Sequence, residues 1–176
     1  MTESLHRWRV KKAARKAVVL GSFASSSIAV RRLTGGTRVR AITYHRFGHA
    51  DRDPWCVTPH AFEQQMRWLA EQKLAVSLDD VLRFARGEIE LASGSVLVTM
   101  DDGFSSVLAE AAPILQRYGI PSVAFITTQA IGDSDAGKGA GEAFLTWEQV
   151  AALGAGGMTI GSHGTHPPLD GQAESR

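Results

Sequence analysis

The stretch Ser95-Val96-Leu97-Val98-Thr99-Met100-Asp101-Asp102-Gly103 decides how this chain folds. Its first six residues form an apolar run that fits a strand buried on both faces. The run stops abruptly on two carboxylates and on Gly103, which can take a positive φ and turn the backbone. Acidic groups at the carboxyl end of a buried strand are how α/β proteins present carboxylates to a ligand. Since Asp also favours helix N-caps, capping of the following helix is the alternative for this pair.

Strand-like and helix-like segments alternate along the rest of the chain. Besides the central strand, the apolar patterns predict strands at 39–44, 74–76, 122–127 and 158–161. A capping residue followed by proline predicts a helix start at Thr58-Pro59. Ser77-Leu78-Asp79-Asp80 is a capping box, so helix capping explains that carboxylate pair. Pro113 and Gly119 are expected to shorten or kink, and then to end, the helix that follows the central strand. The alternation predicts parallel βαβ units in a barrel or a doubly wound sheet.

The charge of the chain is distributed unevenly. The net charge is +1, but residues 1–40 hold ten Lys and Arg and one acid, whereas the remainder holds nine basic and seventeen acidic residues. We therefore predict two domains: a basic N-terminal arm over 1–37 and a globular domain over 38–176. A weakly amphipathic basic arm suits an anionic surface, either a membrane leaflet or nucleic acid. Of these two, we expect peripheral membrane contact and no nucleic-acid partner; the oligomeric state is left open.

The arm leaves three interpretations of where the protein resides. Its moderately apolar segment at 17–30 is too short to span a bilayer. A charged start, a short apolar centre and small residues at 27–29 are compatible with a weak signal peptide and export. A frayed, solvated arm is the plainer alternative. We expect a cytoplasmic or peripheral membrane location, with export as the alternative.

Polar residues follow three of the predicted strands: Tyr44-His45, Asp101-Asp102, and His163 with His166. The carboxyl ends of parallel strands meet at one edge of a sheet, where active sites of such folds lie. The single Cys56 excludes a cysteine-rich zinc site, so a metal would need His and carboxylate ligands. Two histidines and one carboxylate can hold Zn²⁺, Fe²⁺ or a similar ion and leave positions open for water. The second carboxylate could then take a proton from that water.

Two segments resemble the signatures of a known family. Thr99-Met100-Asp101-Asp102-Gly103 resembles the TFDDG signature of the NodB-homology polysaccharide deacetylases, carbohydrate esterase family four. Ser162-His163-Gly164-Thr165-His166-Pro167 resembles their histidine-bearing signature. Thr43-Tyr44-His45-Arg46 and Tyr118-Gly119-Ile120-Pro121 are supporting matches, and the resemblance covers about residues 39–170.

The resemblance implies a fold, an activity and a set of site residues. The fold is a parallel-stranded distorted (β/α) barrel, and the activity is metal-dependent hydrolysis of N-acetyl groups on an N-acetylated polysaccharide or oligosaccharide. Asp101 is implied as the general base, and Asp102, His163 and His166 as ligands of a divalent metal. Zn²⁺ is the first expectation, with Co²⁺, Ni²⁺ or Fe²⁺ as alternatives. Tyr44 and His45 are secondary or substrate-binding candidates.

The sequence departs from the family pattern in two ways. The family's histidines usually have three residues between them, whereas His163 and His166 have two. The later family motifs, including the histidine that protonates the leaving amine, have no counterpart before Arg176, and about five strands can be counted. We therefore expect the amino-terminal part of such a domain, with little or no turnover by this chain alone. A catalytically silent metal- or glycan-binding remnant, or an interaction module, is the rival interpretation; a phosphatase is disfavoured because no loop suited to phosphate is present.

Overall fold

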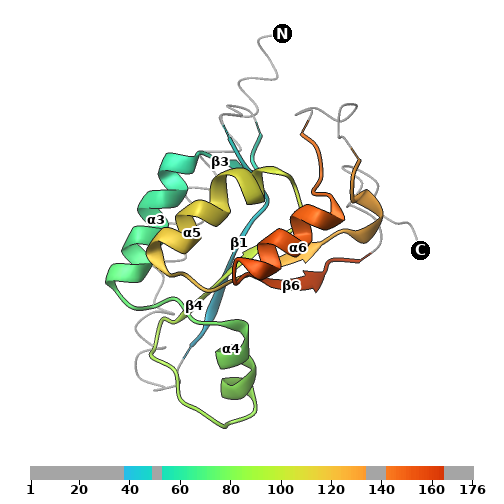
Figure 1. Cartoon of the computed structure of the whole chain (residues 1–176). Coiled ribbons are helices and arrows are strands. Elements are labelled where there is room, and N and C mark those ends of the chain that lie inside the picture. Colours follow the sequence, from blue (N-terminus) through green and yellow to red (C-terminus); the bar gives the residue numbers. More distant parts are fainter. Residues whose placement is uncertain (1–37, 49–52, 134–141, 165–176) are drawn as a thin grey trace, which may run out of the picture. The chain divides into compact units, whose positions relative to one another are not determined.

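A four-stranded parallel sheet organises the chain. The structure, a computed structural model, describes residues 38–48, 53–133 and 142–164, all within the unit Thr37–Arg176. The strands are β1 (Arg40–Tyr44), β4 (Val96–Met100), β5 (Ser122–Ile126) and β6 (Thr159–Ser162), in the order β1-β4-β5-β6 (Figure 1). All three strand pairs are parallel. The predicted parallel α/β architecture is confirmed, and the predicted arm at 1–37 lies outside the described residues.

The predicted central strand is β4, and all five of its residues are buried. It pairs with β1 on one side, where Tyr44 lies opposite Met100, and with β5 on the other. Side chains alternate along a strand, so Val96, Val98 and Met100 join the main core. The alternate side chains of β4 face the opposite side of the sheet.

Three helices cover one face of the sheet: α3 (Pro59–Glu71), α5 (Ala112–Tyr118) and α6 (Trp147–Ala155) (Figure 1). Helix α3 begins as predicted, because the Thr58 hydroxyl accepts a hydrogen bond from the Ala61 N–H at 3.2 Å. Its apolar stripe, which consists of Phe62, Met66 and Leu69, is buried. None of the described helices combines the length and apolarity needed to cross a bilayer.

Helix α4 (Leu78–Ala85) follows the predicted capping box. The Ser77 hydroxyl accepts from the Asp80 N–H at 3.1 Å, and the Asp80 carboxylate accepts from the Ser77 N–H at 3.2 Å. Both orphan N–H groups at the helix start are thereby satisfied. Capping is confirmed as the structural explanation of the Asp79-Asp80 pair.

Two local predictions are wrong. The segment 74–76 forms only a single bridge, between Ala75 and Val96, because the chain enters the capped helix α4 immediately afterwards. A short parallel pair, β2 (Arg46–Phe47) with β3 (Cys56–Val57), forms where the sequence predicts no strand. This pair ties the segment after β1 to the segment that leads into α3.

The helix after β4 is divided at its proline, as expected. A π-helical turn, η1 (Val107–Ala111), precedes α5, and Pro113 lies in the first turn of α5. Proline lacks the N–H that would bond to the carbonyl four residues earlier, and its ring clashes with that carbonyl. The preceding turn is therefore wider, with the Ala112 N–H bonded to the Val107 carbonyl. Gly119 ends α5 with a φ of 62°, as the sequence predicts.

Candidate functional site

A strained turn places the two carboxylates at the end of β4. The Asp101 N–H donates to the Tyr44 carbonyl at 2.8 Å, which extends the β1–β4 pairing to Asp101. The Gly103 N–H then donates to the Asp101 carbonyl at 3.0 Å, around Asp102 with a φ of 72°. A three-residue turn of positive φ is rare and strained. Strain of this kind concentrates at functional sites, because the surrounding structure must hold it in place.

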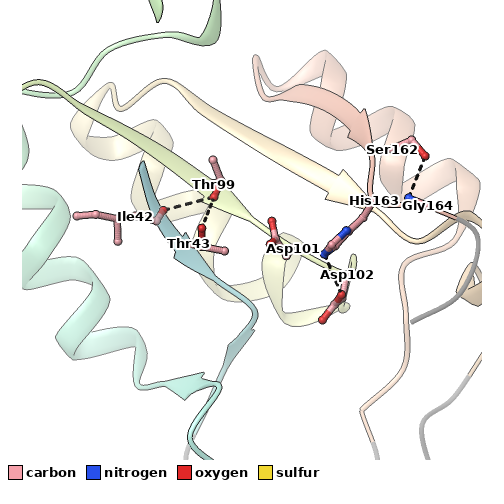
Figure 2. A network of polar contacts seen from close by, with 8 residues as sticks. All are labelled: Ile42, Thr43, Thr99, Asp101, Asp102, Ser162, His163 and Gly164. Atoms are coloured by element: carbon pink, nitrogen blue, oxygen red, sulfur yellow. Dashed lines mark hydrogen bonds and ion pairs between the residues drawn. The ribbon is translucent and has the colours of Figure 1, made fainter. Parts of the chain in front are cut away.

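His163 reaches both carboxylates from the end of β6, two strands away from β4 in the sheet. Its N–H donates to the Ile126 carbonyl at 2.9 Å, directly after β6. Its imidazole points toward the end of β4, and Nε2 lies 3.6 Å from Asp101 Oδ2 and 3.6 Å from Asp102 Oδ1 (Figure 2). Strand β5 lies between β4 and β6 in the sheet. His163 nevertheless meets Asp101 and Asp102, so the convergence that the sequence predicts at one sheet edge is present for these three residues.

Asp102 is a buried carboxylate with an unsatisfied oxygen. The residue is 6% exposed, and its Oδ1 has no hydrogen-bond partner among the described residues. Burial raises the pKa of Asp102 above its usual range, while His45, His163 and Arg46 oppose this rise by their charge. A buried carboxylate is costly unless a cation or hydrogen-bond donors compensate it. The site therefore favours a positively charged partner at Asp102.

These residues fit part of a divalent metal site. A separation of 3.6 Å is too long for a hydrogen bond. Two ligands about 2.1 Å from one tetrahedral ion lie about 3.4 Å apart, close to the separation of His163 Nε2 and Asp102 Oδ1. The described ranges contain no group of three or more His, Cys, Asp or Glu that could hold a metal ion alone. The other predicted ligand, His166, lies outside those ranges.

Tyr44, the last residue of β1, and the next residue, His45, have different surroundings. Tyr44 is 5% exposed, donates its hydroxyl to Gln65 Oε1 and packs edge-on against Phe62 at 4.9 Å between ring centroids. Burial raises the pKa of Tyr44 to about 12. Alternation turns His45 to the other side of the sheet, and its charge lowers the pKa of Asp102. Tyr44 therefore lies in the core, whereas His45 acts electrostatically on the carboxylates.

Three further residues border the site without having been predicted from the sequence. Arg46 lies over the Phe104 ring, 4.0 Å from its centroid, and its Nη1 is 3.5 Å from Asp53 Oδ2. Trp55 packs on His45 with 4.7 Å between ring centroids. Arg46 belongs to the motif Thr43-Tyr44-His45-Arg46 but was not singled out as a site residue, and no periodicity connects His45 with Trp55 or Phe104.

Thr127 connects the ends of β4 and β5. Its N–H donates to the Asp102 carbonyl at 3.1 Å, which helps to hold the strained turn. Its hydroxyl oxygen is buried and, like Asp102 Oδ1, lacks a hydrogen-bond partner within the described part of the chain. Both of these orphaned polar atoms therefore belong to residues at the carboxyl edge of the sheet, where ligands bind in parallel α/β folds.

Comparison with known proteins gives the same family as the sequence signatures. A family model described as polysaccharide deacetylase matches residues 89–176, half of the 176-residue chain. The poly-beta-1,6-N-acetyl-D-glucosamine N-deacetylase of Escherichia coli K12 is 31% identical over 123 residues, which cover 62% of this chain. The matched region is 18% of that protein's length.

Solved structures support the fold. The structure of IcaB from Ammonifex degensii superposes with a TM-score of 0.63 at 27% identity, over 73% of this chain and 53% of that one. The Streptococcus pyogenes deacetylase PplD gives a TM-score of 0.60 at 23% identity, over 77% and 60% of the two chains. The chain thus spans between half and two thirds of these relatives' structures, and its four-stranded parallel sheet corresponds to part of a (β/α) barrel.

Proposed function

Because this chain belongs to the polysaccharide deacetylase family, we propose that its site hydrolyses N-acetyl groups of an amino-sugar glycan with a divalent metal ion. One observation carries the proposal: His163 Nε2 lies 3.6 Å from a carboxylate oxygen of both Asp101 and Asp102. A metal-assisted hydrolysis needs ligands of this kind beside a carboxylate that can accept a proton.

Asp102, His163 and His166 would hold the metal. Asp102 supplies a buried oxygen that has no hydrogen-bond partner in the described residues, and His163 supplies an imidazole nitrogen beside it. When bound there, an ion such as Zn²⁺ would polarise the acetyl carbonyl and lower the pKa of a water molecule. Zn²⁺ suits this mixed imidazole and carboxylate set, and Co²⁺, Ni²⁺ and Fe²⁺ are the alternatives.

Asp101 is the proposed general base. Its side chain is 21% exposed, whereas that of Asp102 is 9% exposed, so Asp101 is the more accessible carboxylate of the pair. It would take a proton as the water oxygen bonds to the acetyl carbon. The carbon–nitrogen bond then breaks, and the products are acetate and the free amine of the sugar.

His45 is the proposed general acid. An amine is a poor leaving group unless its nitrogen is protonated as the bond breaks. His45 follows β1 directly, where the Asp101 N–H bonds to the Tyr44 carbonyl, and its charge lowers the pKa of Asp102. It can donate a proton from the β1 side, while His163 approaches from the β6 side. The assay below tests this assignment against the expectation of little or no turnover by this chain alone.

The substrate class follows from the family and from its relatives. The E. coli relative is named for poly-beta-1,6-N-acetyl-D-glucosamine, so a polymer of N-acetylglucosamine is the substrate to test first. We propose an N-acetylated oligosaccharide or polysaccharide of this class for the present chain. The experiment below determines which glycosidic linkage the chain accepts.

The test measures the release of free amine by the full chain with added Zn²⁺. The substrates are two N-acetylglucosamine tetramers, one β-1,4-linked and one β-1,6-linked. We expect turnover by the wild type and a loss of about 10²–10⁴-fold in Asp101→Asn and in His45→Ala. Asp79→Asn is the matched control, because that carboxylate lies in the first turn of α4 and should leave turnover unchanged.

Two results would contradict the proposal. Wild-type chain that binds Zn²⁺ but releases no amine from either tetramer would favour the catalytically silent interpretation. Turnover that survives in Asp101→Asn would show that Asp101 is not the base.

A further inference from the structure

Trp55 is a large apolar side chain that the core does not use. It lies just before β3 and is 56% exposed. An indole ring offers one of the largest apolar surfaces of any side chain, and such surface is normally buried. A large aromatic residue exposed beside a polar site is a common feature of ligand recognition.

Trp55 lies next to His45, the proposed general acid. Its ring packs on the His45 imidazole, with 4.7 Å between centroids and an angle of 50° between planes. The β1–β4 pairing continues to Asp101, whose N–H bonds to the Tyr44 carbonyl, so the residue after Tyr44 is adjacent to the carboxylates. Trp55 therefore extends the site outward from His45.

The backbone of Trp55 is fixed on both sides. Its N–H donates to Asp53 Oδ1 at 2.9 Å, and its carbonyl accepts from the Arg46 N–H at 3.2 Å. The Arg46 side chain in turn pairs with Asp53 and lies over the Phe104 ring, which follows the strained turn at Asp102. An exposed ring held by its backbone loses little conformational entropy when a ligand covers it, which favours binding.

We propose that Trp55 is a stacking platform for one sugar ring of the glycan, next to the residue that is deacetylated. The inference rests on the proposed function for the class of ligand. A pyranose ring of a β-linked N-acetylglucosamine polymer has apolar faces made of C–H groups, and these faces match the flat indole surface. The hydroxyl and acetamido groups at the edge of the ring would be left to water and to the polar groups of the site.

The chain contains a matched control for this platform. Trp68 is 53% exposed, nearly the same as Trp55, but it lies on the outer side of α3, whose opposite stripe enters the core. Replacement of Trp68 removes the same chemical group from a surface of similar exposure away from the carboxylates. A comparison of the two variants separates stacking on the ligand from a general loss of aromatic surface.

The experiment measures binding of a β-linked N-acetylglucosamine tetramer to full-length chain with Zn²⁺ by calorimetry, and initial rates on the same tetramer. We expect Trp55→Ala to weaken binding about tenfold and to raise KM, Trp55→Phe to lose less, and Trp68→Ala to match the wild type. The loss should shrink when the monosaccharide replaces the tetramer, since no neighbouring sugar is then present to stack. Circular dichroism and unfolding midpoints of all variants report whether the fold is kept.

The outcomes distinguish this inference from the proposed function. Tetramer binding that depends on Trp55 without any amine release would support the platform and contradict the deacetylase activity. Amine release with equal tetramer affinity and KM in wild type and Trp55→Ala would overturn the platform and leave the activity standing. Failure of the wild type to bind the tetramer would overturn the platform, as would equal losses in Trp55→Ala and Trp68→Ala. If Trp55→Ala does not fold, Trp55→Phe and Trp55→Leu decide. Tetramer affinity that is kept in Trp55→Phe but weakened in Trp55→Leu, which is of similar apolar character, supports an aromatic platform. Equal affinity in these two variants overturns it.

Discussion

His163 Nε2 lies 3.6 Å from Asp102 Oδ1, although the strands that precede these residues, β6 and β4, are separated by β5. The strained turn at Asp102 and the short segment after β6 are what bring the two side chains together (Figure 2). Neither group is satisfied by a hydrogen bond to the other at this distance. The separation is compatible with the shared divalent cation that we propose for this pair.

The turn that holds Asp102 depends on Gly103. Gly103 has a φ of 88°, and a Cβ at this position would lie 3.2 Å from Ile126 Cδ1. We expect Gly103→Ala to lower the free energy of unfolding by about 2–3 kcal/mol, from backbone strain plus crowding. Denaturant unfolding monitored by circular dichroism measures the change.

Gly119→Ala is the control for that experiment. Gly119 also has a positive φ, of 62°, but a Cβ there would meet nothing within 4 Å. Its replacement should cost only the backbone strain, about 1–2 kcal/mol. Equal losses in the two variants would show that close packing against Ile126 does not contribute to the turn.

The raised pKa of Asp102 makes stability depend on pH in a defined direction. In the metal-free protein, a carboxyl with a folded-state pKa above its unfolded value stabilises the fold fully below the unfolded pKa. That contribution is lost as pH rises through the folded pKa. We therefore expect the unfolding midpoint of the wild type, measured relative to that of Asp102→Asn in the presence of a chelator, to fall with rising pH. Identical pH profiles for the two proteins would contradict the burial of an uncompensated carboxylate.

Tyr44 should be protected from ionisation by the core. Its pKa is raised from 10.0 to about 12 by burial, so its stabilising effect is complete below pH 10 and is lost as pH rises toward 12. The chain has two tyrosines, and Tyr118→Phe leaves Tyr44 as the only phenol. Phenolate absorbance in that variant should rise near pH 12 or together with alkaline unfolding. Ionisation near pH 10 in a protein that stays folded would place Tyr44 at the surface.

Asp101, Asp102 and His163 show most clearly how much of this site can be predicted from the sequence. Parallel strands bring their carboxyl ends to one edge, so hydrophobic patterns alone predict that residues after β4 and β6 meet there. The same argument failed to separate Tyr44 from His45. Both end the first strand, but adjacent side chains face opposite sides, and the helix-covered side cannot be identified before the helices are placed.

Other features depend on tertiary contacts that have no periodic signal. The expected strand at 74–76 has the right composition, yet the capped helix at Ser77 begins too soon for more than one bridge. Trp55 reaches His45 because Arg46 and Asp53 fix its backbone. Such a contact joins a loop residue to a strand end through the Arg46 backbone and the Asp53 side chain, and local propensity contains no information about it.

The basic arm at 1–37 gives a separate prediction. Its excess of Lys and Arg beside a weak apolar pattern should attract it to anionic lipid, at about 1 kcal/mol for each basic residue near the surface. We expect the full chain to co-sediment with phosphatidylserine vesicles at low salt, and a chain that starts at residue 38 to stay in the supernatant. Equal sedimentation of the two proteins would exclude the arm as the membrane-binding element.

The most direct test of the central claim is the zinc content of the purified chain, measured by mass spectrometry after incubation with Zn²⁺ and removal of excess ion. We expect one zinc per chain in the wild type and in the Asp79→Ala control. We expect loss of that zinc in the Asp102→Asn/His163→Ala double variant, with its fold verified by circular dichroism. One zinc per chain retained by the folded double variant would contradict a metal site at Asp102 and His163.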